Sequence, residues 1–312
     1  MHPEQLLSAV AGEDLERLRP LLPVGYAAGV DAYQAAVAQL TPHELSEHYT
    51  AGLAAFHEVF VPQLKQRLTA LTGGAWDLSD YLAYAAGSDV DLISHVIEAA
   101  APREGVAVFP GDWWGFVVGS SHPEHIVWTD EPAGRLAACC VPSVRNGHLT
   151  AEMVRFLERS AACLLNINLF PTLAPEERER AAQALRPVLP RALLSISFSR
   201  GFGLTASQLG VMLVHRDHPY RARFEGQWRW FTYFYNAIAA RAFSAIDLER
   251  LAQVDKARRQ WAAQWLRERG LPVSETGSYY VKSFTLKGPV PERLQPLTRD
   301  GVVRLCLKPS IV

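Results

Sequence analysis

Lysine is scarce in this sequence, and neither sign of charge is in excess. The five lysines of the 312 residues are Lys65, Lys256, Lys282, Lys287 and Lys308. Lysine and arginine together number 31, against 32 aspartate and glutamate residues, so the formal net charge is -1. A balanced charge creates no long-range field that would attract a polyanion. We therefore expect neither nucleic acid nor a membrane surface as a partner.

Long apolar runs are also missing. No apolar stretch reaches the roughly 18 residues of a membrane span, and no basic region precedes an apolar stretch at the start, as in a secretory signal. These absences predict a cytoplasmic protein. The four cysteines lack Cys-x-x-Cys spacing, so we expect reduced, buried thiols. His43, His48 and His57 lack the i, i+4 spacing of ligands on one helix, and we predict no metal site.

Hydrophobic periodicity divides the chain into three parts. Residues 1–75 carry apolar residues at helical spacing and predict an N-terminal helical segment. Residues 76–245 alternate short apolar runs with helical periods, which predicts a large three-layer α/β domain with a mainly parallel sheet. Residues 246–312 begin with a long helical period and continue as short strands, which predicts a small C-terminal α+β subdomain.

The segment 195–210, SISFSRGFGLTASQLG, is the most specific motif in the chain. It resembles the lysine motif of the fold type I pyridoxal-phosphate-dependent aminotransferases, in which Ser-Phe-Ser-Lys precedes a Phe-Gly-Leu turn, an arginine and a glycine. The matching residues, in register without a gap, are Ser197, Phe198, Ser199, Phe202, Gly203, Leu204 and Gly210. The resemblance extends over about residues 40–312 and implies an aminotransferase-like large domain.

Two basic positions of this motif differ from the family. Arg200 stands in the place of the lysine, and Gln208 stands in the place of the arginine that grips the cofactor phosphate. The lysine amine of the family forms a Schiff base with the cofactor, whereas a guanidinium with a pKa of about 12 or above is no nucleophile near neutral pH. The resemblance therefore indicates a degenerate member that lacks the Schiff-base lysine.

Further departures fall where the family contacts its cofactor. Asn166 replaces the aspartate that keeps the pyridine nitrogen protonated, and Leu169 replaces a tyrosine that contacts the ring. Val144, in VPSVRNG, replaces an asparagine. Because several contact positions change together while the glycines persist, we interpret the pattern as an established change of use.

The resemblance marks a set of candidate ligand-binding positions: Tyr49, Gly87, Ser88, Asp89, Trp113, Asn166, Asn168, Ser197, Arg200, Gln208 and Arg304. Alternatives stay open for several of them. Arg200 either pairs with a carboxylate such as Asp89 or binds the carboxylate or phosphate of a ligand. Trp113, or its neighbour Trp114, is either a stacking platform or an ordinary core or rim residue. Arg304 either binds a substrate carboxylate or forms a structural salt bridge.

These departures predict that no cofactor is needed and that pyridoxal phosphate (PLP) does not bind covalently. We expect a homodimer whose vestigial cofactor pocket binds or transforms an amino-acid-like or other anionic small molecule, with no catalytic residue identified. One alternative is an enzyme that binds PLP noncovalently and uses another base. The other is a non-catalytic scaffold or regulatory partner of a biosynthetic enzyme. Whether the protein is an enzyme is left open.

Overall fold

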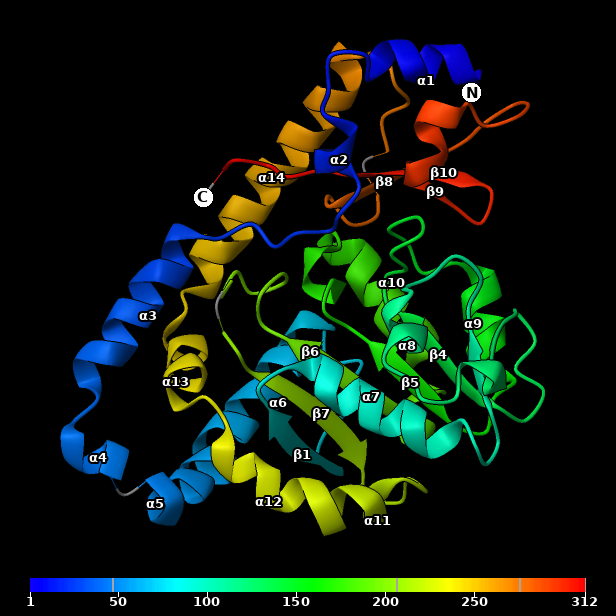
Figure 1. The fold of residues 1–312 in the computed structure, drawn as a ribbon. Coiled ribbons are helices and arrows are strands. Elements are labelled where there is room, and N and C mark those ends of the chain that lie inside the picture. The colour runs from blue at the N-terminus through cyan, green and yellow to red at the C-terminus, as the bar shows by residue number, and fades with distance from the viewer. Residues whose placement is uncertain (47, 206, 275, 312) are drawn as a thin grey trace.

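A seven-stranded sheet forms the centre of the protein (Figure 1). The computed structural model describes residues 1–46, 48–205, 207–274 and 276–311. The strands are β1 (Tyr81–Ala86), β2 (Val106–Val108), β3 (Ile126–Trp128), β4 (Leu136–Cys140), β5 (Cys163–Asn166), β6 (Ala192–Ser197) and β7 (Gly210–His215). Their order across the sheet is β1-β7-β6-β5-β4-β2-β3, and β7 is antiparallel to both of its neighbours while the other pairs are parallel.

Helices cover both faces of this sheet. Successive strand residues alternate between two apolar clusters: Leu165 and Leu194 belong to one, and Leu164 and Leu193 to the other. The first cluster includes residues of α6 (Val61–Leu71), α9 (Ala151–Glu158), α10 (Pro175–Leu185) and α13 (Ala237–Ala245). The second includes residues of α7 (Asp89–Ala100). This alternation is that of strands buried on both faces, and it confirms the three-layer α/β architecture.

The C-terminal part forms a second, smaller sheet. Its strands β8 (Val281–Thr285), β9 (Thr298–Arg299) and β10 (Val302–Cys306) are antiparallel in the order β8-β10-β9. The long helix α14 (Leu248–Glu268) runs from the large domain to this sheet (Figure 1). The small α+β subdomain is confirmed, whereas the boundaries at residues 75 and 245 stay predictions.

The first residues of the chain do not pack on the large sheet. Helix α1 (Pro3–Ala9) and helix α2 (Leu15–Leu18) lie beside the subdomain, far from α3 (Ala27–Gln39) (Figure 1). Leu6 and Leu18 are buried in the same apolar cluster as Phe284 of β8. Residues 19–26 then cross from the subdomain to the large domain, where α3 packs against α13.

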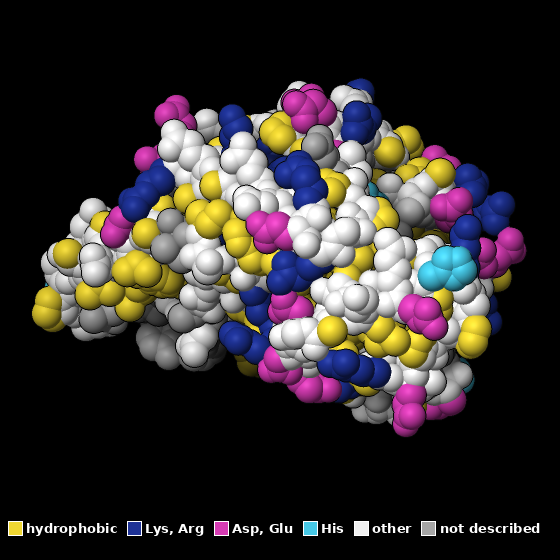
Figure 2. All heavy atoms as spheres, turned by 90° about the horizontal axis from the view of Figure 1, so that it is seen from above, with side chains coloured by type: hydrophobic (Ala, Val, Ile, Leu, Met, Phe, Trp, Pro, Cys, Tyr) yellow, Lys and Arg dark blue, Asp and Glu magenta, His cyan; other side chains and the backbone are white. Residues whose placement is uncertain are grey.

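The remaining helices are short and lie at the periphery of the large domain. They are α4 (Pro42–Ser46), α5 (His48–Ala55), α8 (Gly115–Val118), α11 (Arg221–Arg223) and α12 (Arg229–Phe231), with π-helical turns at Phe56–Phe60 and Phe224–Trp228. Acidic and basic side chains are interspersed over the face shown in Figure 2, in keeping with the balanced composition. Within the described ranges, no helix has the length and apolarity that a membrane span requires.

Candidate functional site

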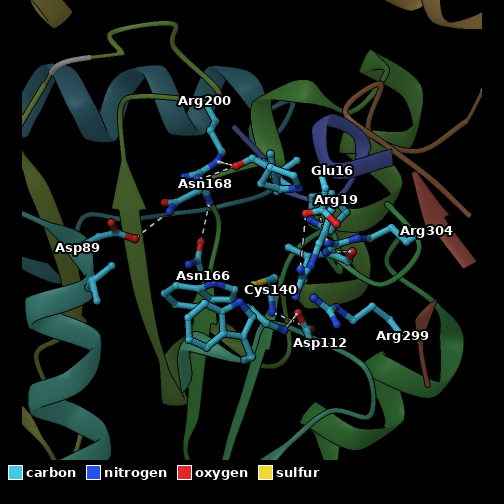
Figure 3. A pocket seen from close by; sticks show the side chains of 18 residues that line it. Glu16, Arg19, Asp89, Asp112, Cys140, Asn166, Asn168, Arg200, Arg299 and Arg304 are labelled. Atoms are coloured by element: carbon cyan, nitrogen blue, oxygen red, sulfur yellow. Dashed lines mark hydrogen bonds and ion pairs between the residues drawn. The ribbon is translucent and has the colours of Figure 1, made fainter. Parts of the chain in front are cut away.

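A cavity of about 800 Å³ lies between the large sheet and the small subdomain. The start of α7, the loop at residues 112–114 and the segment that follows β4 line it from the large domain, together with the end of β5 (Figure 3). Residues 16–21, β9 and β10 line it from the subdomain side. The parallel strands β4 and β5 point their carboxyl ends at this cavity, which is the usual place for a ligand in an open α/β sheet.

The start of α7 brings a carboxylate to one end of the cavity. Ser88 caps the helix, because its hydroxyl accepts a hydrogen bond from the backbone N–H of Val90 at 3.1 Å. Asp89 follows and is only 5% exposed. Its Oδ2 accepts hydrogen bonds from Asn168 Nδ2 at 2.7 Å and from Ser195 Oγ at 3.3 Å (Figure 3). The Asp89 carboxylate is therefore held by side chains that follow β5 and lie in β6.

Close packing fixes this carboxylate in place. A Cβ atom on Gly210, at the start of β7, would lie 1.9 Å from the backbone nitrogen of Asp89, so only glycine fits there. Burial raises the pKa of Asp89, while the hydrogen bond from Asn168 and the nearby charge of Arg200 lower it. The glycine of the sequence motif thus serves the approach of α7 to the sheet.

Asn166 ends β5 and Asn168 follows two residues later, and the two asparagines form a polar floor of the cavity. Asn168 Oδ1 accepts a hydrogen bond from the backbone N–H of Ser197 at 2.5 Å. The backbone N–H of Asn168 donates to Asn166 Oδ1 at 3.1 Å. Both side chains line the cavity and are buried. Among the described residues, Asn166 Nδ2 has no acceptor within hydrogen-bond distance, so this donor is available to a ligand.

The two arginines that the sequence singled out bind backbone carbonyls instead of carboxylates. Arg200 donates from Nε and Nη2 to the carbonyl oxygen of Leu21, at 3.3 and 3.0 Å. Arg304 donates from Nη2 to the carbonyl of Arg19 at 2.8 Å and from Nη1 to that of Val144 at 3.2 Å. Neither guanidinium forms an ion pair with an acid of the described chain, so the proposed salt bridge of Arg304 is absent there. Both residues hold the N-terminal segment against the cavity.

Three residues that line the cavity are not among the candidates that the sequence predicts. Arg19 and Arg299 face the cavity from the subdomain side, and burial together with the charges of Arg304 and Arg19 lowers the pKa of Arg299. Asp112 accepts hydrogen bonds from the N–H groups of Trp113 at 2.7 Å and Cys140 at 2.9 Å, and burial raises its pKa to about 6. The only indication of Asp112 in the sequence is its position directly before the candidate residue Trp113.

The other candidate positions are distributed as follows. Trp113 and Trp114 line the cavity, whereas Gly87, Ser88, Ser197 and Gln208 are not part of its lining. Gln208 is exposed and has a positive φ of 41°. Tyr49 belongs to α5, but its side chain lies outside the described residues. Their roles in ligand binding stay predictions.

None of the residues that line the cavity is a lysine. Lys282 is the most buried lysine, and it donates to the carbonyls of Ser274 and Thr276 at 3.1 and 3.2 Å. Burial lowers its pKa to about 8, but it lies in β8, away from the cavity lining. In the described part of the chain, no group of three or more histidine, cysteine or acidic side chains could hold a metal ion.

Comparison with known proteins supports the fold through structure alone. No family model matches the chain, and no curated protein matches it in sequence. Among solved structures, a methionine aminotransferase, YbdL from Escherichia coli, superposes with a TM-score of 0.64 and 14% identity over 97% of this chain and 91% of that one. The N-succinyldiaminopimelate aminotransferase from Mycobacterium tuberculosis gives a TM-score of 0.61 and 14% identity over 90% and 79%.

A third structure corrects the expectation about a cofactor. The histidinol-phosphate aminotransferase from Sinorhizobium meliloti, solved in complex with pyridoxal-5'-phosphate, superposes with a TM-score of 0.58 and 15% identity over 92% of this chain and 84% of that one. The inference from Arg200, Gln208 and Asn166 that no cofactor is needed is wrong by this comparison, which points to PLP. Substitutions at single contact positions leave the fold and its cavity in place. The chain has the fold of the fold type I, PLP-dependent aminotransferases.

Proposed function

We propose that the cavity binds an anionic small molecule and that PLP is the first ligand to consider. The observation that carries this proposal is the lining of the cavity by four guanidinium groups, those of Arg19, Arg200, Arg299 and Arg304. Acidic side chains also line it, but Asp89 is engaged by Asn168 and Ser195. A cavity with this charge and about 800 Å³ of space suits a ligand that carries phosphate or carboxylate.

The described residues fit PLP through hydrogen bonds, charge and stacking. Asn166 Nδ2 is a free donor for a pyridine nitrogen, Trp113 is an aromatic residue of the lining, and the arginines can bind a phosphate. When bound, PLP supplies an aldehyde and an electron-withdrawing ring. Asn166 would hold the ring nitrogen by donating a hydrogen bond without transferring a proton, since an amide is neutral. Asp112, with its pKa of about 6, is the cavity group best suited to exchange a proton near neutral pH.

Titration of the purified protein with PLP tests this proposal. Trp113 and Trp114 line the cavity, so quenching of tryptophan fluorescence, with calorimetry in parallel, reports binding. We expect saturable binding that weakens about tenfold in Asn166→Ala, because one hydrogen bond to the ligand is lost. Gln253→Ala is the matched control, since Gln253 is exposed in α14 and outside the lining. Absence of saturation at millimolar PLP would exclude PLP as the ligand.

We also propose that the protein forms a homodimer. Helix α3 exposes Val30 by 57% and Val37 by 56%, and seven residues of spacing place them on one face of the helix. Trp230 of α12 is 69% exposed. Figure 2 shows hydrophobic side chains on the projecting part of the surface over α3. Exposed apolar groups of this kind mark interaction surfaces.

Light scattering coupled to size-exclusion chromatography measures the mass of the particle in solution and so tests the proposed homodimer directly. We expect a mass of two chains for the wild type and of one chain for Val37→Glu, because a charge in an apolar interface is costly. Lys256→Glu, a charge change elsewhere, is expected to leave the dimer intact. A wild-type mass of one chain across micromolar concentrations would disprove the proposal.

A further inference from the structure

We propose that the carboxylate of Asp112 binds an ammonium group of the ligand, so that the cavity takes an anionic molecule that also carries an amine. This inference rests on the proposed function for the anionic part of the ligand. It adds the opposite charge that the ligand carries and a residue that the aminotransferase resemblance does not mark.

Asp112 lies in the loop after β2, and its carboxylate is held at the carboxyl end of β4. Its Oδ2 accepts a hydrogen bond from the backbone N–H of Cys140, the last residue of β4, at 2.9 Å. Its Oδ1 accepts one from the backbone N–H of Trp113 at 2.7 Å. Cys140 pairs with Asn166 in the sheet register. The Asp112 carboxylate therefore lies one strand away from Asn166, and both side chains line the cavity (Figure 3).

This carboxylate is buried without a cation of the chain beside it. Asp112 is only 2% exposed. Among the described residues, no lysine, arginine or histidine nitrogen lies within 4 Å of its oxygens, and the groups that donate to it are neutral backbone N–H groups. Burial raises its pKa to about 6, so the side chain is mostly ionised at neutral pH. A buried charge of this kind costs free energy, which a cation in the cavity would offset.

The other two acids of the described lining are in different situations. Burial raises the pKa of Asp89, but the positive charge of Arg200 opposes this effect. Glu16 Oε2 lies 3.7 Å from Arg19 Nη1, and the Glu16 side chain is 73% exposed, so water already stabilises its charge. Of these three acids, Asp112 alone combines burial with the lack of a cationic neighbour. It is therefore the acid of the lining from which a ligand cation has most to gain.

An ammonium group suits this position through its charge and its hydrogen bonds. It carries three N–H donors, and each oxygen of the Asp112 carboxylate can accept a further hydrogen bond. None of the residues that line the cavity is a lysine, so no amine of the chain competes for this carboxylate. The arginines of the lining supply positive charge for the anionic part of the same ligand. Both amino acids and pyridoxamine phosphate, the amine form of PLP, carry this pair of charges.

Two compounds that differ in a single group test the inference. Pyridoxamine phosphate carries an ammonium group, and pyridoxine phosphate carries a hydroxyl in its place. Calorimetry at neutral pH measures both with the wild type, with Asp112→Asn and with the control Asp91→Asn, an exposed aspartate of α7 outside the lining. We expect the wild type and the control to bind pyridoxamine phosphate about tenfold or more tightly than pyridoxine phosphate. Asp112→Asn should lose this preference and keep the wild-type affinity for pyridoxine phosphate.

Ethylammonium chloride is a probe that needs neither the ring nor the phosphate, and sodium chloride is its reference salt. Thermal unfolding measures its effect on the same three proteins. We expect ethylammonium to stabilise the wild type and Asp91→Asn more than Asp112→Asn, because only Asp112→Asn lacks the buried carboxylate. Circular dichroism spectra check that each variant is folded.

The outcomes separate this inference from the proposed function. If neither phosphate compound nor PLP binds but ethylammonium retains its preference for the wild type, PLP is excluded and the ammonium site stands. If both phosphate compounds bind the wild type with equal affinity, the proposed function stands and the ammonium site is wrong. An equal loss of both compounds in Asp112→Asn would assign Asp112 to the shape of the cavity and would also overturn the site. If no phosphate compound binds and ethylammonium acts equally on all proteins, both proposals are wrong.

Discussion

The two ends of the cavity differ in whether their charged side chains have partners. At the α7 end, Asp89 is buried and engaged by Asn168 and Ser195, with the charge of Arg200 nearby. At the subdomain end, Arg19 and Arg299 lie together without a buried acidic partner in the described chain. A buried polar network that is satisfied stabilises one arrangement of the chain. An uncompensated cluster at a cavity wall forms no such network, so the first end should contribute more to stability than the second.

The largest effect is expected from Asp89→Ala. This change leaves the amide of Asn168 and the hydroxyl of Ser195 without their acceptor in a buried site. We expect a loss of about 3 kcal/mol in the free energy of unfolding, measured by urea denaturation. Asp91→Ala is the control, because Asp91 is exposed in the same helical turn. Equal losses in the two variants would show that the Asp89 contacts do not support the fold.

Asp112 provides a test through pH. Its pKa is raised to about 6 from an ordinary value of 3.8, so the folded protein binds a proton that the unfolded chain releases. The neighbouring thiols of Cys139 and Cys140 have pKa values raised by burial and stay neutral in this range. The stability from protonated Asp112 is therefore fully present below about pH 4 and is lost as the pH rises through 6.

The expected size is about 2 to 3 kcal/mol between pH 4 and pH 7, from roughly 1.4 kcal/mol for each unit of pKa shift. The comparison is between wild type and Asp112→Asn, which keeps an acceptor but cannot ionise. Their difference in unfolding free energy should change over this range in favour of the variant. If the unfolding free energies of the two proteins changed with pH in parallel, Asp112 would have an ordinary pKa and would not be suited to exchange a proton near neutral pH.

Arg304→Gln and Arg299→Gln sharpen the contrast within one end. Loss of the guanidinium of Arg304 removes hydrogen bonds to Arg19 and Val144, which predicts a loss of about 1 to 2 kcal/mol in stability. Arg299→Gln relieves repulsion between like charges and should change stability by less than about 0.5 kcal/mol. Thermal or urea unfolding of both variants measures these changes in stability. A greater loss for Arg299→Gln than for Arg304→Gln would contradict this expectation.

The smallest effect is expected at Gln208. Its φ of 41° lies in the left-handed region, where a side chain costs free energy that glycine avoids. Gln208→Gly should raise stability by about 0.5 kcal/mol and leave the affinity for PLP unchanged. Weaker PLP binding in this variant would indicate that Gln208 makes the ligand contact that the family resemblance assigns to its position.

The fold could be predicted because its signals are local. Alternating strands and helices indicated the three layers, and the motif ending at Gly210 indicated the aminotransferase-like fold, whereas the close approach of Gly210 to α7 is known only from the structure. Asn166 and Asn168 could be placed together because they are two residues apart at a strand end. The cofactor expectation failed because substitutions at a few contacts do not reveal what the remaining cavity can bind.

The subdomain end of the cavity could not be predicted for a physical reason. Arg19 and Arg299 carry no periodic or motif signal, and only the complete fold brings them together. Arg19 also precedes the region of residues 40–312 over which the resemblance extends. The partners of Arg200 and Arg304 are backbone carbonyls, which every residue possesses, so side-chain identities gave no indication of these hydrogen bonds.

The N-terminal segment that Arg200 and Arg304 hold also has a consequence for the order of folding. Arg304 and the carbonyl it binds at Arg19 are 285 residues apart, and the Arg200 contact with Leu21 spans 179. Contacts of such long range close large loops and form slowly. The cavity should therefore be completed late in refolding, and ligand affinity would report the finished molecule. Because a ligand of this kind binds only that state, its presence would favour the fully folded chain over any partly folded one.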